Sequence, residues 1–208
     1  MGAIFIGVGL AALTASMHNK SGALSHHMFM HIVLMNLLAP GAALVFLSSF
    51  PVLMERIGNR LWSAFVAQLV LFLGWHSPIG LETASMSAMA AMLMQASLAL
   101  AAFWFWACVF ASVQSRRWET VGALILTGKI FCLFAALLVF SPRVLYSSVS
   151  HASSVLIADQ QLAGLLMLTA CPLTYLGACM WFTAKWFYKL DHQSGVRSIQ
   201  IPSHASLR

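Results

Sequence analysis

Long apolar runs, almost free of charged side chains, follow one another along the whole of this chain. Only 8% of its 208 residues are charged and 61% are hydrophobic, whereas a soluble domain carries about 25% charged residues. The chain has too few polar side chains to cover a water-soluble globule, which excludes a soluble enzyme, a disordered tail and a disulfide-rich secreted module. The composition predicts an all-α fold, a polytopic transmembrane helical bundle.

The apolar sequence divides into about six spans, because a helix needs about 20 residues to cross a hydrocarbon core about 30 Å thick. Their approximate bounds are Gly2 to Met17, His26 to Ser48, Leu61 to Trp75, Ala84 to Val113, Thr120 to Ser141 and Gln161 to Phe187. Residues 1–190 then form one helical bundle, and residues 191–208 form a polar cytoplasmic tail that we expect to be a loose extension. No basic residue precedes the first span, so we interpret it as a retained helix rather than a signal peptide.

The loop charges predict the orientation of this bundle. Of the eleven Lys and Arg residues, eight fall in one set of loops and two in the opposite set. Because basic residues collect in cytoplasmic loops, the first set and both termini should be cytoplasmic. The same asymmetry explains the net charge of +6, so we expect membrane lipid around the chain and no nucleic-acid partner.

Histidines gather at the predicted outer ends of the spans. Six of the eight lie there, namely His18, His26, His27, His31, His76 and His151. His27 and His31 are four residues apart, so both project from one helical face, and Met35 extends that stripe by another turn. His76 stands just before Pro78, which ends the third span. Ionisable side chains within spans are uncommon and tend to be functional.

Methionines gather toward the same predicted side of the membrane. Met86, Met89 and Met92 follow an i, i+3, i+6 path down one side of the fourth span, although methionine also serves as an ordinary packing residue. Imidazole and thioether ligands suit copper, and Cu(I) in particular accepts methionine. Asp159 precedes the sixth span, where its carboxylate either caps the helix or orients an imidazole. The candidate metal ligands are therefore His27, His31, His76, Asp159, Met35, Met86 and Met89.

The four cysteines lie inside apolar runs, and no two of them form a C-x-x-C pair. They are Cys108, Cys132, Cys171 and Cys179. We interpret them as small buried hydrophobic residues.

Three segments of the chain resemble the CtaG-type cytochrome c oxidase assembly factors, a family of polytopic bacterial membrane proteins. They are His27-Met28-Phe29-Met30-His31, Trp75-His76-Ser77-Pro78 and Asp159-Gln160-Gln161-Leu162-Ala163-Gly164, of which the last is the most specific. The resemblance implies a protein of the bacterial inner membrane that helps to make a haem–copper oxidase by supplying copper to it. It carries over His27, His31, His76 and Asp159 as site positions and implies the subunits of a terminal oxidase as partners.

One departure from the family concerns the fourth span, where the family carries further histidines and this chain has methionines. We expect a cytochrome c oxidase assembly factor that handles copper at the periplasmic face. The alternatives are a non-catalytic accessory subunit of a respiratory terminal oxidase complex and a haem-binding protein with His31 and His76 as axial ligands. We expect no enzymatic activity, because no nucleophile–base pair, phosphate loop or carboxylate pair within one span is recognisable.

Overall fold

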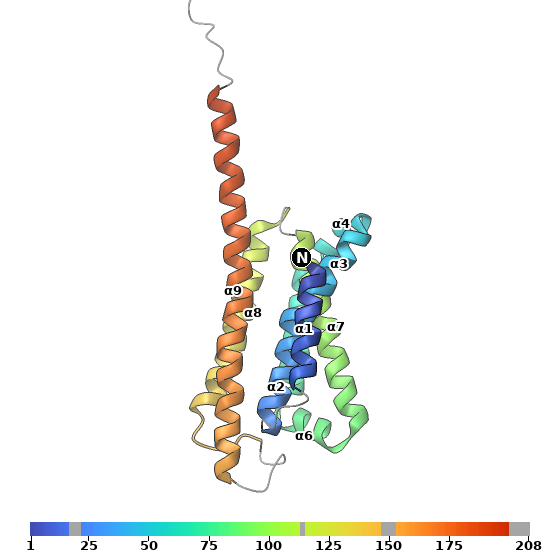
Figure 1. The fold of residues 1–208 in the computed structure, drawn as a ribbon, viewed down its shortest axis with the longest axis vertical. Helices are drawn as coiled ribbons and strands as arrows, with labels where there is room; N and C mark the ends of the chain where they lie inside the picture. Colours follow the sequence, from blue (N-terminus) through green and yellow to red (C-terminus); the bar gives the residue numbers. More distant parts are fainter. Residues whose placement is uncertain (17–21, 113–114, 147–152, 200–208) are drawn as a thin grey trace, which may run out of the picture.

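The computed structural model describes residues 1–16, 22–112, 115–146 and 153–199, and this part of the chain is helical without any strand. The long helices run side by side along one axis (Figure 1). Their bounds are α1 Gly2–Ser16, α2 Ala23–Val33, the π-helix η1 Leu34–Leu38, α3 Ala39–Ser49, the 3₁₀-helix η2 Pro51–Leu53, α4 Met54–Gly58, α5 Leu61–Trp75, α6 Pro78–Met86, α7 Ala88–Ser112, α8 Arg117–Phe140 and α9 Ser153–Ile199.

Four helical stretches of the described chain are long and apolar enough to cross a membrane. They are Leu24–Ser49, Ala88–Ser112, Arg117–Phe140 and Leu156–Asp191. A fifth arises if Pro51–Gly58 and Leu61–Trp75, which meet at a bend of 73°, are counted as one span, and Gly2–Thr14 is a shorter apolar helix. The prediction of an all-helical membrane protein is confirmed, while the number of six spans stays a prediction.

The helix that carries His27 and His31 runs through a π-helical turn. Ala39 donates its N–H to the carbonyl of Leu34, five residues back, and Pro40 follows within the first turn of α3. Proline has no N–H to donate, so the bonding pattern changes just ahead of it. The wider turn buries Met35 and Asn36, and π-turns of this kind are frequent at functional sites.

The expected fourth span, from Ala84 to Val113, is two helices in the structure. Ser77 caps α6, because its Oγ accepts a hydrogen bond from the Gly80 N–H at 3.1 Å. Ser87 is extended, with φ −141° and ψ 125°, and separates α6 from α7. Ala84 therefore belongs to α6 and not to the long helix, because the extended Ser87 follows it.

The last helix, α9, continues well beyond the bundle (Figure 1). It has 47 residues, which corresponds to a length of about 70 Å at 1.5 Å per residue. Residues 191–199, expected as part of a loose extension, are therefore helical, and residues 200–208 lie outside the described chain. The helix continues through Pro172 and through Gly164, Gly177 and Gly195 without a break.

Polar and aromatic side chains meet at the centre of the bundle. Trp106 stacks on Tyr175 with their ring centroids 5.4 Å apart, and its indole N–H donates to the Met35 carbonyl at 3.0 Å. Gln68 donates from Nε2 to the Tyr175 hydroxyl, also at 3.0 Å. These bonds link α5, α7 and α9 to the π-helical turn, because each buried donor needs a partner when water is excluded.

We expect Tyr175→Phe to lower the free energy of unfolding by about 1 kcal/mol, because it leaves the buried Gln68 amide without its acceptor. Thermal unfolding of the purified protein in detergent measures the change. The double variant Tyr175→Phe, Gln68→Leu should recover most of the loss, since replacing both partners by apolar groups is nearly neutral. Equal unfolding midpoints for wild type and Tyr175→Phe would contradict this account.

Candidate metal centre

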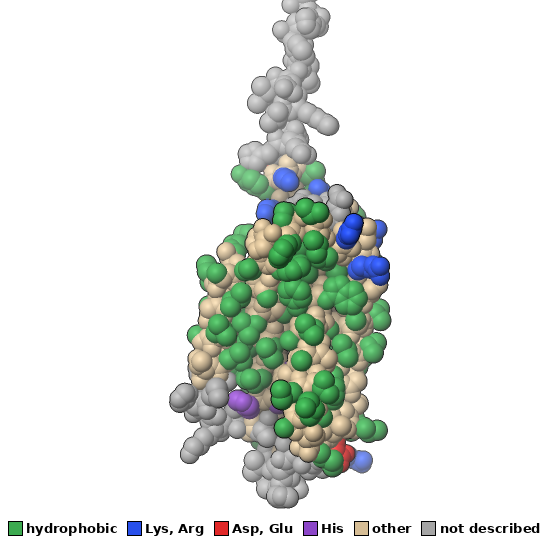
Figure 2. Space-filling model, turned by 90° about the vertical axis from the view of Figure 1, so that its right-hand side faces the viewer, with side chains coloured by type: hydrophobic (Ala, Val, Ile, Leu, Met, Phe, Trp, Pro, Cys, Tyr) green, Lys and Arg blue, Asp and Glu red, His purple; other side chains and the backbone are tan. Residues whose placement is uncertain are grey.

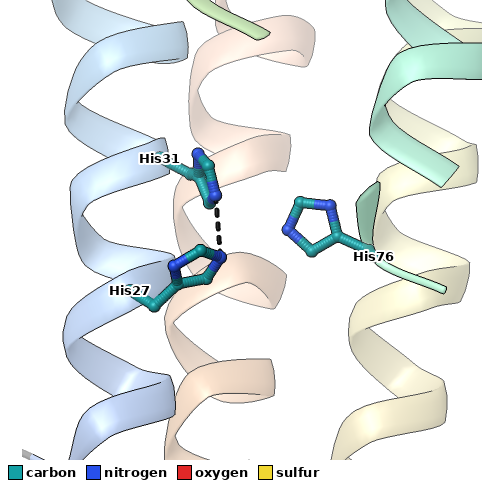
Figure 3. Close-up of side chains that lie close together, drawn as sticks. All are labelled: His27, His31 and His76. Atoms are coloured by element: carbon teal, nitrogen blue, oxygen red, sulfur yellow. Dashed lines mark hydrogen bonds between the residues drawn. The ribbon is translucent and has the colours of Figure 1, made fainter. Parts of the chain in front are cut away.

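Three histidines from two distant parts of the sequence converge inside the bundle. His27 and His31 project from one face of α2, and His76 projects toward them from the turn that follows α5 (Figure 3). One ring nitrogen from each residue can be chosen so that all three lie within 4.8 Å of one another. Nitrogen ligands about 2 Å from one ion are about 3.5 Å apart, so small rotations of the side chains bring these nitrogens to coordination distance.

The imidazoles of His27 and His31 are joined by a hydrogen bond. Their Nε2 atoms are 2.9 Å apart, and a hydrogen bond between two ring nitrogens needs one protonated donor and one acceptor. His31 is only 4% exposed, and its ring meets that of His27 edge-on at a centroid distance of 4.3 Å. The i, i+4 spacing on α2 therefore produces a coupled pair of rings rather than two independent side chains.

The ring of His76 is held in one tautomer. Its Nδ1 lies 2.8 Å from the Phe72 carbonyl, and because a carbonyl only accepts, Nδ1 carries the hydrogen. Nε2 therefore keeps its lone pair, and this buried atom has no hydrogen-bond partner. A histidine that donates one ring N–H to a backbone carbonyl and offers its other nitrogen is the usual arrangement of a metal ligand.

Packing fixes the position of the His76 ring. Phe72 stacks on it at a centroid distance of 4.2 Å, and the Tyr146 hydroxyl donates to the His76 carbonyl at 2.6 Å. Burial lowers the pKa of His76, which lies just beyond the end of α5, so the ring is neutral and able to bind a metal. Burial also raises the pKa of Tyr146 to about 12, so its hydroxyl stays protonated and remains a donor.

Asp159 binds the helix that carries two of the three histidines. Its carboxylate accepts the backbone N–H groups of Leu24 at 2.8 Å and of Ser25 at 3.1 Å. These are free donors in the first turn of α2, whose own N-cap residue, Gly22, offers no side chain. A Cβ added to Gly22 would overlap the Asp159 carboxylate. Asp159 lies within α9 and not before it, and it caps α2 instead of its own helix. Among the described residues, the cluster of possible metal ligands contains the three histidines and not Asp159.

The comparison with protein families decides what kind of protein this is. The family model of the cytochrome c oxidase caa3 assembly factors matches residues 2–189. The chain belongs to this family. No curated protein and no solved structure matches it. The resemblance inferred from the three sequence motifs is thus confirmed, and all three lie within the matched residues.

In this caa3 assembly factor, the Asp-Gln-Gln-Leu-Ala-Gly motif holds the bundle together around the histidines. Gln160 accepts the N–H of Leu145 at 2.8 Å and donates to the carbonyl of Leu138 at 3.2 Å. Gly164 lets α9 approach α8 closely, because an added Cβ would lie 2.8 Å from the Ala135 carbonyl oxygen. The motif therefore joins α9 to α2 through Asp159 and to α8 and its following loop through Gln160 and Gly164.

Asp159→Ala should lower the free energy of unfolding of the assembly factor by about 1–2 kcal/mol, because it removes a charged cap that accepts two backbone N–H groups. Thermal unfolding in detergent measures the difference. Glu82→Ala is a matched control, since Glu82 is an exposed acidic residue on α6. Equal effects of the two substitutions would show that the cap contributes nothing.

The methionines predicted as ligands occupy two different environments. Met35 is buried, with 3% of its surface exposed, and lies one turn further along α2–η1 than His31. Met86 and Met89 are 76% and 65% exposed, which places them on the outer surface of the bundle rather than among the buried histidines. Their spacing identified a common face but not the direction of that face. His18 and His151 lie outside the described residues.

Three sulfur-bearing residues near the histidines were not among the predicted ligands. Met28, Met167 and Cys171 line a small cavity together with His31 and Met35. Met28 and Met35 are seven residues apart, and Met167 and Cys171 are four apart, so each pair lies on one helical face. That spacing was available from the sequence, but nothing in it indicated that the two faces meet.

Proposed function

We propose that this cytochrome c oxidase assembly factor binds copper at His27, His31 and His76 and delivers it to subunits of a terminal haem–copper oxidase. The observation that carries the proposal is the buried convergence of the three rings, in which His76 offers an unpartnered Nε2. Neutral imidazole suits copper and zinc. Copper is the metal that a haem–copper oxidase needs, and here it is cargo rather than a resident cofactor.

We place this site near the periplasmic face of a bacterial inner membrane. Figure 2 shows Lys and Arg side chains mainly at one end of the molecule and histidine toward the other. Exposed residues at the basic end include Arg56, Arg60, Lys185 and Lys189, and basic residues mark the cytoplasmic side. The proposal includes six spans with both termini cytoplasmic, with α1 as the first span and the bent α4–α5 pair contributing the third.

A pocket beside His27 gives the metal a path to and from the three histidines. It has a volume of about 150 Å³ and is lined by residues of α2, α6 and α7, including Leu81, Met94 and Gln95. His27 is the half-buried member of the three, whereas His31 and His76 are buried. The site therefore has one accessible ligand, which suits a carrier that must release its metal, and we propose no catalytic step.

The proposal is tested in cells that lack the chromosomal copy of this chain. Plasmid-borne wild type and the variant His27→Ala, His76→Ala are compared, and the copper-to-haem ratio of the purified oxidase is measured. We expect wild type to restore the ratio and the variant to leave the oxidase deficient in copper but not in haem. His26→Ala is the matched control, since His26 neighbours His27 but lies outside the three-ring cluster. An oxidase with full copper in cells carrying the variant would overturn the proposal.

The accessory-subunit alternative predicts a different result in the same cells. An accessory subunit copurifies with the oxidase in fixed ratio, and its histidine variants leave the copper content unchanged. The haem alternative requires a porphyrin between the rings of His31 and His76. The Nε2 of His31 instead faces the Nε2 of His27 at 2.9 Å, so the structure favours a small ion over a porphyrin at this position.

A further inference from the structure

A second cavity adjoins His31 on the side of the bundle interior. Its sulfur-bearing lining consists of Met28 and Met35 from the α2–η1 helix and Met167 and Cys171 from α9. Its volume of about 10 Å³ is close to that of the smallest cavity able to hold one water molecule. The space is therefore suited to a single small ion and excludes a larger ligand.

Four sulfur-bearing side chains line this cavity and offer the donor types that a soft metal ion prefers. The side chains of Met28, Met35, Met167 and Cys171 are between 0% and 3% exposed. Thioether and thiolate sulfur select Cu(I) over harder ions. Within the described part of the chain, one hydrogen bond reaches a sulfur of this set, a long one of 3.9 Å from the Asn36 amide to the Cys171 Sγ, so these donors remain available.

His31 supplies the observation that separates this cavity from ordinary methionine packing. Its Nδ1 is buried and has no hydrogen-bond partner, although the side chain lines the cavity and is only 4% exposed. Figure 3 shows this second nitrogen on the side of the ring that faces away from His27. A buried polar atom left unpaired costs about 1–3 kcal/mol, and a metal ion in the cavity would satisfy it.

We propose that the sulfur-lined cavity is a second Cu(I) site, and that His31 belongs to both sites in turn. This inference rests on the proposed function, since the three histidines would load the cavity. A neutral imidazole has one lone pair. With copper held by the three histidines, the lone pair is on Nε2 and the proton on Nδ1. With copper in the cavity, the lone pair is on Nδ1, and the Nε2–H donates to His27 across the 2.9 Å bond seen here.

The two positions are therefore alternatives, and one chain holds one copper ion. The ion stays Cu(I) in both positions, and no electron is transferred. The bonds that change are those to copper, the N–H bond of His31 and the S–H bond of Cys171. While the cavity is empty of metal, Nδ1 gives its proton to a water molecule there and Nε2 takes one from water in the pocket beside His27, and Cys171 releases its thiol proton to solvent when it binds the ion. The sulfur position holds the ion among Met28, His31, Met35, Met167 and Cys171, none of which is more than 4% exposed, and so away from bulk water.

The test uses the purified full-length chain in detergent without oxygen, loaded with Cu(I) from a bidentate aromatic chelator. Copper per chain is counted, and copper X-ray absorption identifies the neighbouring atoms. We expect wild type to bind one copper with sulfur and nitrogen neighbours. The double variant Met35→Leu, Cys171→Ala should bind one copper with nitrogen neighbours alone, and its affinity for copper should be at least about tenfold weaker than that of wild type. The double variant His27→Ala, His76→Ala should bind one copper with sulfur neighbours.

A matched control replaces buried sulfur outside both cavities, as in Cys108→Ala, Cys179→Ala, and should behave as wild type. Labelling wild type with selenomethionine gives a measurement that does not depend on the folding of a variant, because a bound copper should then show a selenium neighbour. Copper with nitrogen neighbours alone in wild type would overturn the second site and leave the proposed function standing. Loss of all copper from His27→Ala, His76→Ala would also overturn it, and wild type without any bound copper would overturn both proposals.

Discussion

Replacing His76 with alanine should weaken Zn²⁺ binding by the purified protein at least about 100-fold, since even the partners that orient a metal ligand contribute 10–100-fold. Zn²⁺ is a useful probe of the three histidines because it is redox-inert and is commonly bound by imidazole nitrogen. The buried, unpartnered Nε2 of His76 completes the nitrogen set. Isothermal titration calorimetry in detergent measures the affinity of wild type and variant.

The control for this prediction is again His26→Ala, which removes a histidine one residue from the cluster. His76→Gln adds a second comparison, because an amide of similar reach fills the space next to Phe72 without offering an imidazole. We expect His26→Ala to bind Zn²⁺ as wild type does and His76→Gln to resemble His76→Ala. Similar affinities for His26→Ala and His76→Ala would refute the assignment of the nitrogen set.

Gly80→Ala should lower the free energy of unfolding by about 2 kcal/mol or more, although the same change in a free helical position stabilises by about 1 kcal/mol. An added Cβ would overlap the carbonyl oxygen of Gly74 and lie 2.9 Å from that of Trp75. Both atoms belong to the backbone, which cannot rotate away as a side chain can. The turn that presents His76 would have to open, so Zn²⁺ affinity should fall together with stability.

Gly74→Ala is the matched control, because a Cβ added to Gly74 meets nothing within 4 Å. Thermal unfolding in detergent should show a lower midpoint for Gly80→Ala and an unchanged or higher one for Gly74→Ala. The opposite order would mean that the turn between α5 and α6 is loose and does not position His76.

The sequence predicts those parts of the site that depend on local helix geometry. The stripe formed by His27, His31 and Met35 follows from a spacing of four residues on one helix, and the structure has these residues on one face of α2–η1. His76 was identified because Pro78 ends a span just after it. In both cases the relevant contacts lie within one or two turns of the chain.

The remaining parts depend on contacts between helices, which local spacing does not reveal. The position of Asp159 before a helix indicated a cap, but not that the capped helix would be α2, more than 130 residues away. The spacing of Met86 and Met89 indicated a common face, and that face points outward. Cys171 looked like a small buried hydrophobic residue and is buried, but its meeting with Met35 depends on how α9 packs against η1.

The fit between Gly22 and Asp159 has a consequence for how this chain tolerates change. Any side chain at position 22 takes the space that the carboxylate needs, so Gly22→Ala is harmful only while Asp159 is present. Once the carboxylate has been removed, the glycine is no longer required, and the two losses should not add. The effects of substitutions at positions 22 and 159 on stability are thus coupled, although most of the sequence separates the two positions.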